Sequence, residues 1–244
     1  MEKKFELTDN FVINAFGIKL FQIKCTKSFK YANEGDLGGY VEKEDNLSQY
    51  GDAWVSGDAQ VYGDAQVYGE AQVYGNARVS GNVQVYGDAW VYGNAQVYGN
   101  AQVYGYAWVY GDAQVSGDAQ VYGDAQVYGN AWVYGDARVS GNARVYGDAQ
   151  VYGNARVSGD AQVYGNARVE NNHMHCGFDC FGSCNRHTHA YKTKGNKVEI
   201  TCGCFRGSLE EFEKKVEETH KGTIYEKQYK AIINLIKIKF GIDG

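Results

Sequence analysis

Apolar and polar positions follow one six-residue pattern from Gly51 to Glu170, in twenty blocks without an insertion. Within a block a small apolar residue, nearly always alanine, stands two positions before a valine, as Ala53 does before Val55. Both therefore point to one side of a strand, while Gln, Arg or Trp and then Tyr or Ser point to the other. A fixed short period of this kind predicts a parallel β-solenoid with alanine and valine inside and glycine at each corner.

The segment before the repeat predicts a β-hairpin that caps the solenoid. Its apolar residues suit strands at Phe11–Asn14 and Lys19–Cys25, with a turn near Gly17. Solenoid ends present unpaired strand edges, and a cap prevents the ends from stacking on one another. The chain is therefore predicted to contain an N-terminal cap at 1–50, a solenoid at 51–170 and a C-terminal unit at 171–244.

The residues after the repeat predict a small α+β unit, a hairpin followed by two helices. Two segments alternate in strand fashion, and a capping box of Ser208 and Glu211 opens the first helix. The predicted elements are strands at His189–Lys194 and Lys197–Cys202, a helix up to His220, and a second helix from about Tyr225 to Lys239.

Coils of eighteen residues, three blocks each, would stack identical side chains on the outside. One outward face would then carry a tyrosine column beside a tryptophan column, and an exposed aromatic patch of this kind marks an interface. Stacked identical side chains also stabilise neighbouring strands, which is the structural alternative. Coils of two blocks would bring different side chains into register, and the prediction of an aromatic interface would no longer follow. The predicted interface residues are Trp54, Trp90, Trp108, Tyr74, Tyr92, Tyr110 and Tyr128.

Composition and charge indicate the cellular compartment and the kind of partner. The six cysteines, the lack of an apolar run long enough for a membrane span, and a start without an apolar signal core predict a cytoplasmic protein with free or metal-bound thiols. The repeat carries 5 Lys+Arg against 12 Asp+Glu, a charge of −7, whereas residues 171–244 carry 12 against 9, a charge of +3. An acidic solenoid argues against nucleic acid as its ligand.

Histidines and cysteines gather after the repeat, where all five histidines and five of the six cysteines lie. Zinc takes four such ligands, and the three-residue gap between cysteines is within the usual range. The candidate zinc ligands are His173, His175, Cys176, Cys180, Cys184, His187 and His189. The surplus of candidates fits no single zinc motif, so free thiols and loop histidines without a cofactor are the alternative.

A second polar set in the same unit suggests a ligand site. Cys204 lies a few residues before a predicted helix N-terminus, which would stabilise a thiolate, and Arg186 suits a phosphate or a carboxylate. The candidate ligand-binding residues are Ser183, Arg186, Thr188, Tyr191, Cys202, Cys204 and His220. The alternative is that Cys202 and Cys204 are buried apolar residues of a small core.

The repeat resembles the hexapeptide-repeat left-handed β-helix family. In that family three hexapeptides form one triangular coil, which implies about seven left-handed coils here. The family more often places glycine directly after the inward aliphatic residue, whereas Tyr or Ser intervenes in this chain. Its acyltransferases and carbonic anhydrases use histidines on or beside the coils. Residues 51–170 contain no histidine and no loop insertion, which argues against those activities.

Two flanking segments resemble phage and prophage hexapeptide-repeat proteins. The first is GDLGGYVEKEDNLSQYGDAWV, which runs straight into the regular blocks. The second joins Thr188, Tyr191, Thr193 and Lys194 to ITCGCFRGSLEEFEKKVEETH. The resemblance implies an origin in a phage or prophage rather than a mechanism.

These observations together predict a non-enzymatic binding protein of the bacterial host cytoplasm. It would capture or block a host defence protein or a small signalling molecule, and the C-terminal unit would provide recognition or homo-oligomerisation. One alternative is an enzyme or a metal-dependent site built from Cys, His and Arg residues of that unit. Another is a structural solenoid that assembles end to end.

Overall fold

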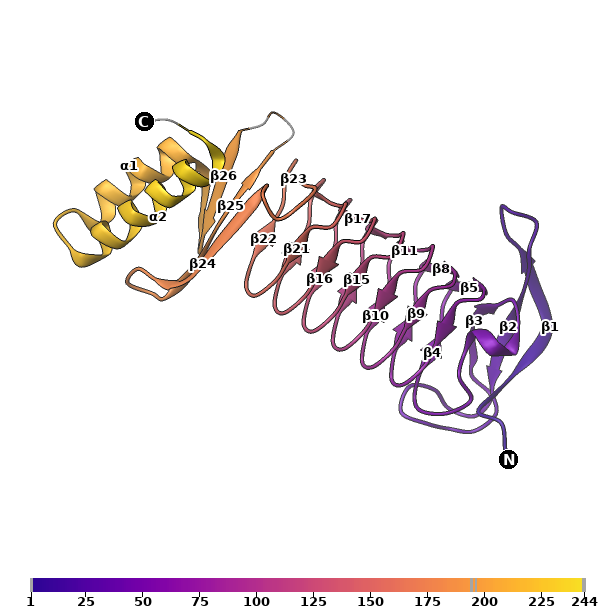
Figure 1. The fold of residues 1–244 in the computed structure, drawn as a ribbon. Helices are drawn as coiled ribbons and strands as arrows, with labels where there is room; N and C mark the ends of the chain where they lie inside the picture. Colours follow the sequence, from indigo (N-terminus) through magenta and orange to yellow (C-terminus); the bar gives the residue numbers. More distant parts are fainter. Residues whose placement is uncertain (1, 194, 196, 243–244) are drawn as a thin grey trace.

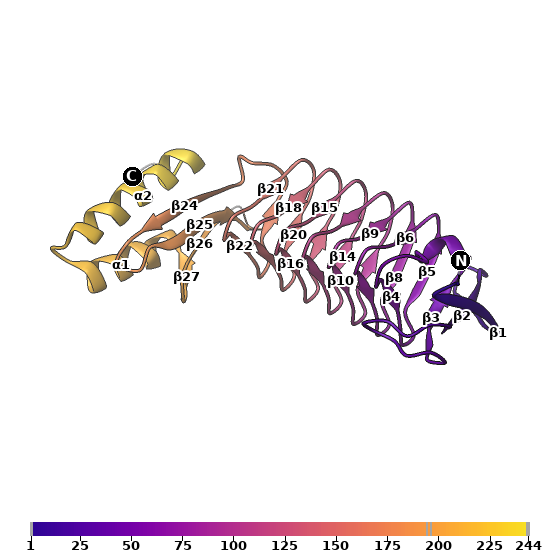
Figure 2. The same cartoon turned by 90° about the horizontal axis from the view of Figure 1, so that it is seen from below.

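A computed structural model describes residues 2–193, 195 and 197–242. The molecule is an elongated rod, with the N-terminal strands at one end, the solenoid as its shaft and the two helices at the other end (Figures 1 and 2). None of the described helices combines the length and the apolar character that a membrane span requires.

Three parallel sheets form the faces of the solenoid. Paired strands are eighteen residues apart, with Trp90 opposite Trp108 and Gln102 opposite Gln120. Three blocks therefore make one coil, and the alternative of two blocks per coil is wrong. The predicted triangular parallel β-solenoid of about seven coils is confirmed. The left-handed sense of the coil stays a prediction.

Each face has its own set of short strands. The first contains β5 (Gln60–Gly63), β8 (Arg78–Gly81), β11 (Gln96–Val97), β14 (Gln114–Val115), β17 (Trp132–Val133), β20 (Gln150–Val151) and β23 (Arg168–Val169). The second contains β4 (Trp54–Val55), β7 (Gln72–Val73), β10 (Trp90–Val91), β13 (Trp108–Val109), β16 (Gln126–Val127), β19 (Arg144–Val145) and β22 (Gln162–Val163). The third contains β6 (Gln66–Val67), β9 (Gln84–Val85), β12 (Gln102–Val103), β15 (Gln120–Val121), β18 (Arg138–Val139) and β21 (Arg156–Val157).

The inward alanine and valine side chains form the core of the solenoid, as predicted. Ala107 and Val109, for example, are fully buried. Their carbonyls accept hydrogen bonds from the backbone N–H groups of Trp90 (2.9 Å) and Tyr92 (3.0 Å) in the preceding coil. Because most coils donate to the next in this way, proline, which has no N–H, would break the ladder. The chain contains no proline.

The N-terminal cap extends the first face beyond the solenoid. It contains β1 (Phe5–Ile13), β2 (Lys19–Cys25), β3 (Leu37–Val41) and a 3₁₀ helix (Glu44–Asn46). β1 and β2 form the predicted hairpin, but β1 begins at Phe5 and ends one residue before Asn14. The polar run Thr8–Asn10 interrupts the apolar pattern of β1, so the sequence did not indicate the first half of the strand. The strand register shifts at the same place. β3 then pairs in parallel with β5.

The C-terminal unit is a four-stranded antiparallel sheet with two helices on one face. It contains β24 (His175–Phe181), β25 (Arg186–Lys192), β26 (Val198–Cys202), β27 (Phe205–Ser208), α1 (Leu209–His220) and α2 (Ile224–Phe240). Both predicted helices are confirmed, and the Ser208 hydroxyl accepts the Glu211 N–H at the start of α1.

The predicted hairpin is the centre of this sheet, and its two outer strands were not predicted. β24 shows no clean alternation because Cys180 takes a left-handed φ of 62° where the register shifts. β27 is only four residues long and contains Gly207. Lys194, which the predicted hairpin and the resemblance to phage proteins both include, lies outside the described residues.

The other face of the C-terminal sheet meets the last coil of the solenoid. Tyr164, at the end of a tyrosine column, packs edge-on against Tyr191 with 6.1 Å between ring centroids. The Arg206 guanidinium lies 4.0 Å from the Tyr164 ring centroid. His189 Nδ1 donates a hydrogen bond to the Gln162 carbonyl at 3.0 Å. One face of the sheet therefore attaches the unit to the shaft, and the opposite face carries the helices.

Candidate functional site

A cavity of about 540 Å³ opens in the C-terminal unit, between the turns of the sheet and the helices. Its volume lies within the range of small-molecule sites, ~300–1,000 Å³. We call it the C-terminal pocket. It is lined by Ser183, Cys184, Arg186, Cys202, Cys204, Phe205, Arg206, Phe212, Lys215, Val216, Thr219, His220 and Tyr229.

The turn after β24 is fastened to α2, which holds one wall of the pocket in place. The Gly182 N–H donates to Gln228 Oε1 at 3.0 Å. Gly182 has a φ of 75°, and the Tyr229 hydroxyl occupies the space where a side chain at this position would begin. Only glycine fits both demands. Ser183 and Cys184 follow directly and line the pocket.

An aromatic and sulfur-containing layer forms the floor of the pocket. The Tyr229 ring stacks with His220, with 5.4 Å between centroids, and takes Phe212 edge-on at 5.6 Å. Its hydroxyl lies 3.7 Å from Cys202 Sγ, which accepts a hydrogen bond from Thr188 Oγ1 at 3.3 Å. Burial raises the pKa of Tyr229, so the phenol stays neutral at physiological pH. The floor therefore offers ring faces and a neutral hydroxyl.

The charged side chains of the pocket are all basic. Arg186 and Lys215 contribute to the lining, and no described lining residue is acidic; Arg206 also lines the pocket, but its guanidinium stacks on Tyr164 on the solenoid side of the sheet. Arg206 also contacts Glu199 at 3.4 Å and Lys215 contacts Glu218 at 3.7 Å, whereas Arg186 forms no salt bridge within the described residues. The Arg186 side chain lies across Gly203, which has a φ of 60° and no side chain in its way. Arg186 is therefore the cation best placed to receive an anion.

Five of the seven predicted ligand-binding residues meet at this pocket: Ser183, Arg186, Cys202, Cys204 and His220. Thr188 lies fully buried behind Cys202. Tyr191 lies elsewhere. It is buried on the opposite face of the sheet, beside Tyr164, and its hydroxyl donates to Glu199 Oε2 at 3.3 Å.

Cys204 lies a few residues before α1, as predicted, but an intervening strand keeps it beyond the first turn of the helix, where a thiolate would be stabilised. The four residues of β27 lie between it and α1, which is about 13 Å of extended chain. Cys204 is exposed in the turn between β26 and β27, whereas Cys202 is only 7% exposed. The alternative of a buried core cysteine therefore describes Cys202 and is wrong for Cys204.

Two groups of lining residues were missed by sequence reasoning. Phe212 and Val216 belong to the apolar stripe of α1, and Tyr229 to that of α2, so all three were assigned to the core. They do pack in that core, and their edges also face the pocket. No local sequence pattern distinguishes Arg206 or Lys215 from other charged residues of the unit.

The predicted zinc ligands do not gather around one point. Within the described residues, no group of three or more His, Cys, Asp or Glu side chains is arranged to hold a metal ion. Cys176 packs against the helix-side core, while Cys180 and Cys184 are exposed. His173 is exposed beyond the end of the solenoid, beside Arg156 and Glu170.

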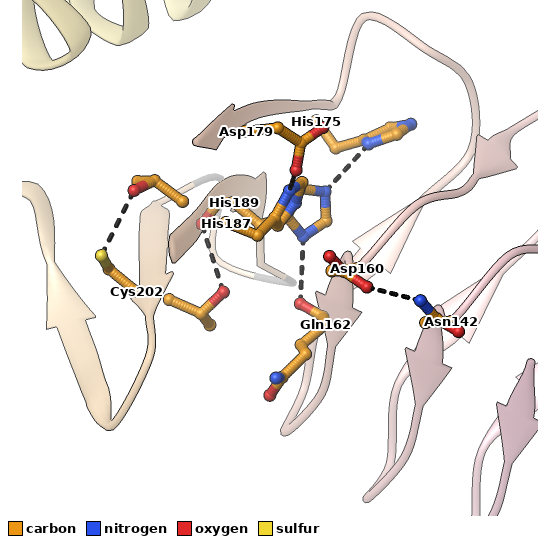
Figure 3. A network of polar contacts seen from close by, with 10 residues as sticks. Asn142, Asp160, Gln162, His175, Asp179, His187, His189 and Cys202 are labelled. Carbon is orange, nitrogen blue, oxygen red and sulfur yellow. Dashed lines mark hydrogen bonds and ion pairs between the residues drawn. The ribbon is translucent and has the colours of Figure 1, made fainter. Parts of the chain in front are cut away.

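The remaining three predicted histidines, His175, His187 and His189, lie close together at the junction with the solenoid (Figure 3). His189 Nδ1 must donate to the Gln162 carbonyl, so its Nε2 accepts from His175 Nδ1 at 3.0 Å. His187 Nδ1 forms a hydrogen bond with Asp179 Oδ1. His175 directs its other nitrogen away from the neighbouring rings (Figure 3). His175 Nε2 and His187 Nε2 are buried without a hydrogen-bond partner, whereas the other ring nitrogens contact protein groups. Within the described residues the set is not arranged to hold a zinc ion.

Burial keeps two of these histidines neutral. It lowers the pKa of His189 to about 3 and that of His175 to about 4, because the charged imidazolium loses its hydration inside the protein. His175 and His189 therefore form an uncharged pair between the solenoid and the C-terminal unit at physiological pH.

The predicted aromatic columns exist, but the proposed patch is smaller than expected. Tyr74, Tyr92, Tyr110 and Tyr128 stack with centroids 4.8–4.9 Å apart, and Trp90 stacks on Trp108 at 5.4 Å. Trp54 is only 3% exposed because Phe29 of the cap covers it edge-on. The prediction of an exposed Trp54 is therefore wrong. In both columns the ring faces meet each other, which leaves mainly ring edges for solvent or a partner.

Comparison with protein-family models finds segments of the repeat that are similar to a known β-solenoid repeat. Residues 71–87, 95–111, 119–135, 125–138, 137–150, 149–162 and 161–173 match the family model described as the YdcK β-solenoid repeat. No curated protein matches the chain. The matched segments are thus similar to a β-solenoid repeat, in agreement with the three-sheet structure, and they end before the C-terminal pocket.

Proposed function

We propose that this chain is a non-enzymatic binding protein whose C-terminal pocket holds a small anionic molecule with a planar apolar part. The observation that carries this proposal is the composition of the lining: the basic residues Arg186 and Lys215, with no described acidic residue, above an aromatic floor. Arg186 binds the anion in a forked, charge-assisted manner. The rings of Tyr229, His220 and Phe212 take the planar part.

A binding role suits the cysteines of the site better than a catalytic one does. A catalytic thiol requires a nearby group that stabilises its thiolate. Cys202 instead lies between the Thr188 and Tyr229 hydroxyls and the apolar core, and Cys204 is separated from the start of α1 by β27. These contacts favour packing and shape over nucleophilic chemistry.

The solenoid acts in this proposal as a rigid spacer that holds the pocket away from the capped end. The resemblance of the flanking segments to phage and prophage proteins supports a role in a bacterial host cytoplasm. There the captured molecule is a host signalling nucleotide or a similar anion, and a host protein or a second copy of the chain is the partner for the outer surface. End-to-end assembly is disfavoured because the cap covers the first coil and the C-terminal unit covers the last.

Replacement of Arg186 by alanine is expected to weaken binding of the anion about 10- to 100-fold. A charge-assisted hydrogen bond contributes about 1.5–3 kcal/mol. The full chain is purified from bacteria, its small molecules are released by denaturation and identified by mass, and each is titrated back calorimetrically, with AMP, cyclic AMP and inorganic phosphate as added probes.

Arg138→Ala serves as the matched control, since Arg138 is an exposed arginine on the solenoid. It should leave the affinity unchanged. The proposal is contradicted if no anion is released or bound, or if Arg186→Ala binds as tightly as the original chain. A ligand that is recovered chemically altered would instead favour the enzyme alternative.

A further inference from the structure

One outward tyrosine column is interrupted near the N-terminal end of the solenoid. On the first face, Tyr62 of β5 pairs in register with Ser80 of β8, and the next coil places Tyr98 beside Ser80. Farther along the same column, Tyr134 and Tyr152 stack with centroids 5.0 Å apart. Ser80 therefore leaves one step of the column without a ring.

The vacant step is a cavity of about 530 Å³ with aromatic walls. We call it the Ser80 slot. Tyr62 and Tyr98 stand on either side of it, two ladder steps apart, or roughly 10 Å from the spacing of stacked tyrosines in this column. A flat ring placed midway would lie about 5 Å from each tyrosine, within the ~4.5–7 Å at which aromatic rings attract each other.

The hairpin of the N-terminal cap closes one side of the Ser80 slot. Phe16 and Ile18 line the cavity, and Phe16 lies 6.5 Å from Tyr62 between ring centroids. The hairpin tip is locally fixed, because Asn14 Oδ1 accepts the N–H groups of Phe16 (2.9 Å) and Ile18 (3.0 Å). Gly17 supplies the left-handed φ of 78° between them. The chain therefore presents two apolar side chains to the slot from a preformed turn.

A single charged side chain gives the Ser80 slot its polarity. Arg78 is the only Lys, Arg, Asp or Glu among the described lining residues, and it pairs in register with Gln60 and Gln96, both neutral. Arg78 forms no salt bridge within the described part of the chain. A guanidinium without a carboxylate partner, at the edge of an aromatic slot, suits a phosphate or carboxylate.

From this geometry we infer that the Ser80 slot is a second binding site, which takes a planar aromatic molecule bearing an anionic group. The ring inserts between Tyr62 and Tyr98 and completes the column, and the anion meets Arg78. This site is separate from the C-terminal pocket and shares no residue with it.

The test fills the slot with the side chain that the other coils carry. The probes are 4-hydroxybenzoate, AMP and FMN, planar anions of increasing size, and adenosine and riboflavin are their neutral counterparts. Binding to the full chain is measured by calorimetry, and ring contact by saturation-transfer NMR. Ser80→Tyr is expected to weaken binding of at least one anionic probe 10-fold or more. Tyrosine already occupies this column in neighbouring coils, so the fold should be unaffected, and circular dichroism checks this.

Two further variants make the result specific. Ser116→Tyr fills the corresponding gap between Tyr98 and Tyr134 and should leave binding unchanged. Arg78→Gln, which copies Gln60 and Gln96, should weaken the anionic probes 10-fold or more and spare the neutral ones. Loss of binding on Arg186→Ala belongs to the C-terminal pocket, and loss on Ser80→Tyr to the slot, so failure of one site is distinguishable from failure of the other.

The inference is overturned if no probe binds saturably, or if binding survives Ser80→Tyr unchanged. Equal losses in Ser116→Tyr and Ser80→Tyr would also overturn it, because the hairpin-closed slot would then not be the site. If Arg78→Gln leaves the anionic probes unaffected, the anionic part of the inference is wrong.

Discussion

The Gly99→Ala variant is expected to lose about 2–5 kcal/mol of unfolding free energy. Gly99 has a φ of 77°, a left-handed conformation that costs an ordinary residue ~1–2 kcal/mol. A Cβ atom at this position would also lie 2.9 Å from the backbone nitrogen of Gly117 in the next coil. That atom cannot move aside without disturbing the ladder, which adds an overpacking cost of ~1–3 kcal/mol.

Gly159→Ala separates the two causes. Gly159 has a similar φ of 66°, but no neighbouring atom lies within 4 Å of the added Cβ. Only the conformational cost of ~1–2 kcal/mol is expected there. Denaturant midpoints followed by circular dichroism give the comparison. Equal losses in the two variants would show that crowding between coils contributes nothing.

The joint between the solenoid and the C-terminal unit is expected to weaken as the pH falls from 6.5 towards 3. Burial holds the pKa of His189 at about 3 in the folded chain, below its ordinary value of 6.5. The unfolded state therefore binds the proton first, and stability is lost as the pH drops through this window. For His189 alone the loss is on the order of 2 kcal/mol at pH 5. His175, whose pKa is lowered to about 4, changes in the same direction.

Unfolding in urea at pH 7.5, 6 and 5 measures this loss, above the range in which most carboxylates titrate. His189→Gln should be less stable at pH 7.5, because the bonds to Gln162 and His175 are lost, yet flatter in its pH dependence. His173→Gln removes an exposed histidine and should keep the original slope. A slope that His189→Gln leaves unchanged would place the titrating group elsewhere.

The solenoid could be predicted from sequence because its order is local and repeated. Ala53 and Val55 stand for a pattern that recurs in every block, so the inward and outward sides follow from strand alternation. The burial of Trp54 could not be predicted in this way. It depends on Phe29, twenty-five positions away in an irregular part of the cap, and no periodicity connects the two.

The C-terminal pocket was predicted in part because its polar residues are chemically distinctive. Ser183, Arg186 and Cys202 were selected for what they can bind, and their closeness follows from the antiparallel pairing of β24, β25 and β26. Strand alternation also separates two of the predicted residues. Tyr191 is an odd number of positions from Thr188, so the two must face opposite sides of β25. The aromatic floor depends on how the helices pack on the sheet, which local patterns do not encode.

Because paired strands are eighteen residues apart, the number of blocks sets the relative orientation of the two ends of the solenoid as well as its length. Insertion of three blocks would move the two ends apart by one rung, ~4.8 Å, and preserve their mutual azimuth. Insertion of a single block would swing the C-terminal pocket about a third of a revolution around the long axis, relative to the hairpin that closes the Ser80 slot. The number of blocks thus encodes both the span and the angular phase between the two cavities, and evolution can adjust either one by duplicating short stretches of DNA.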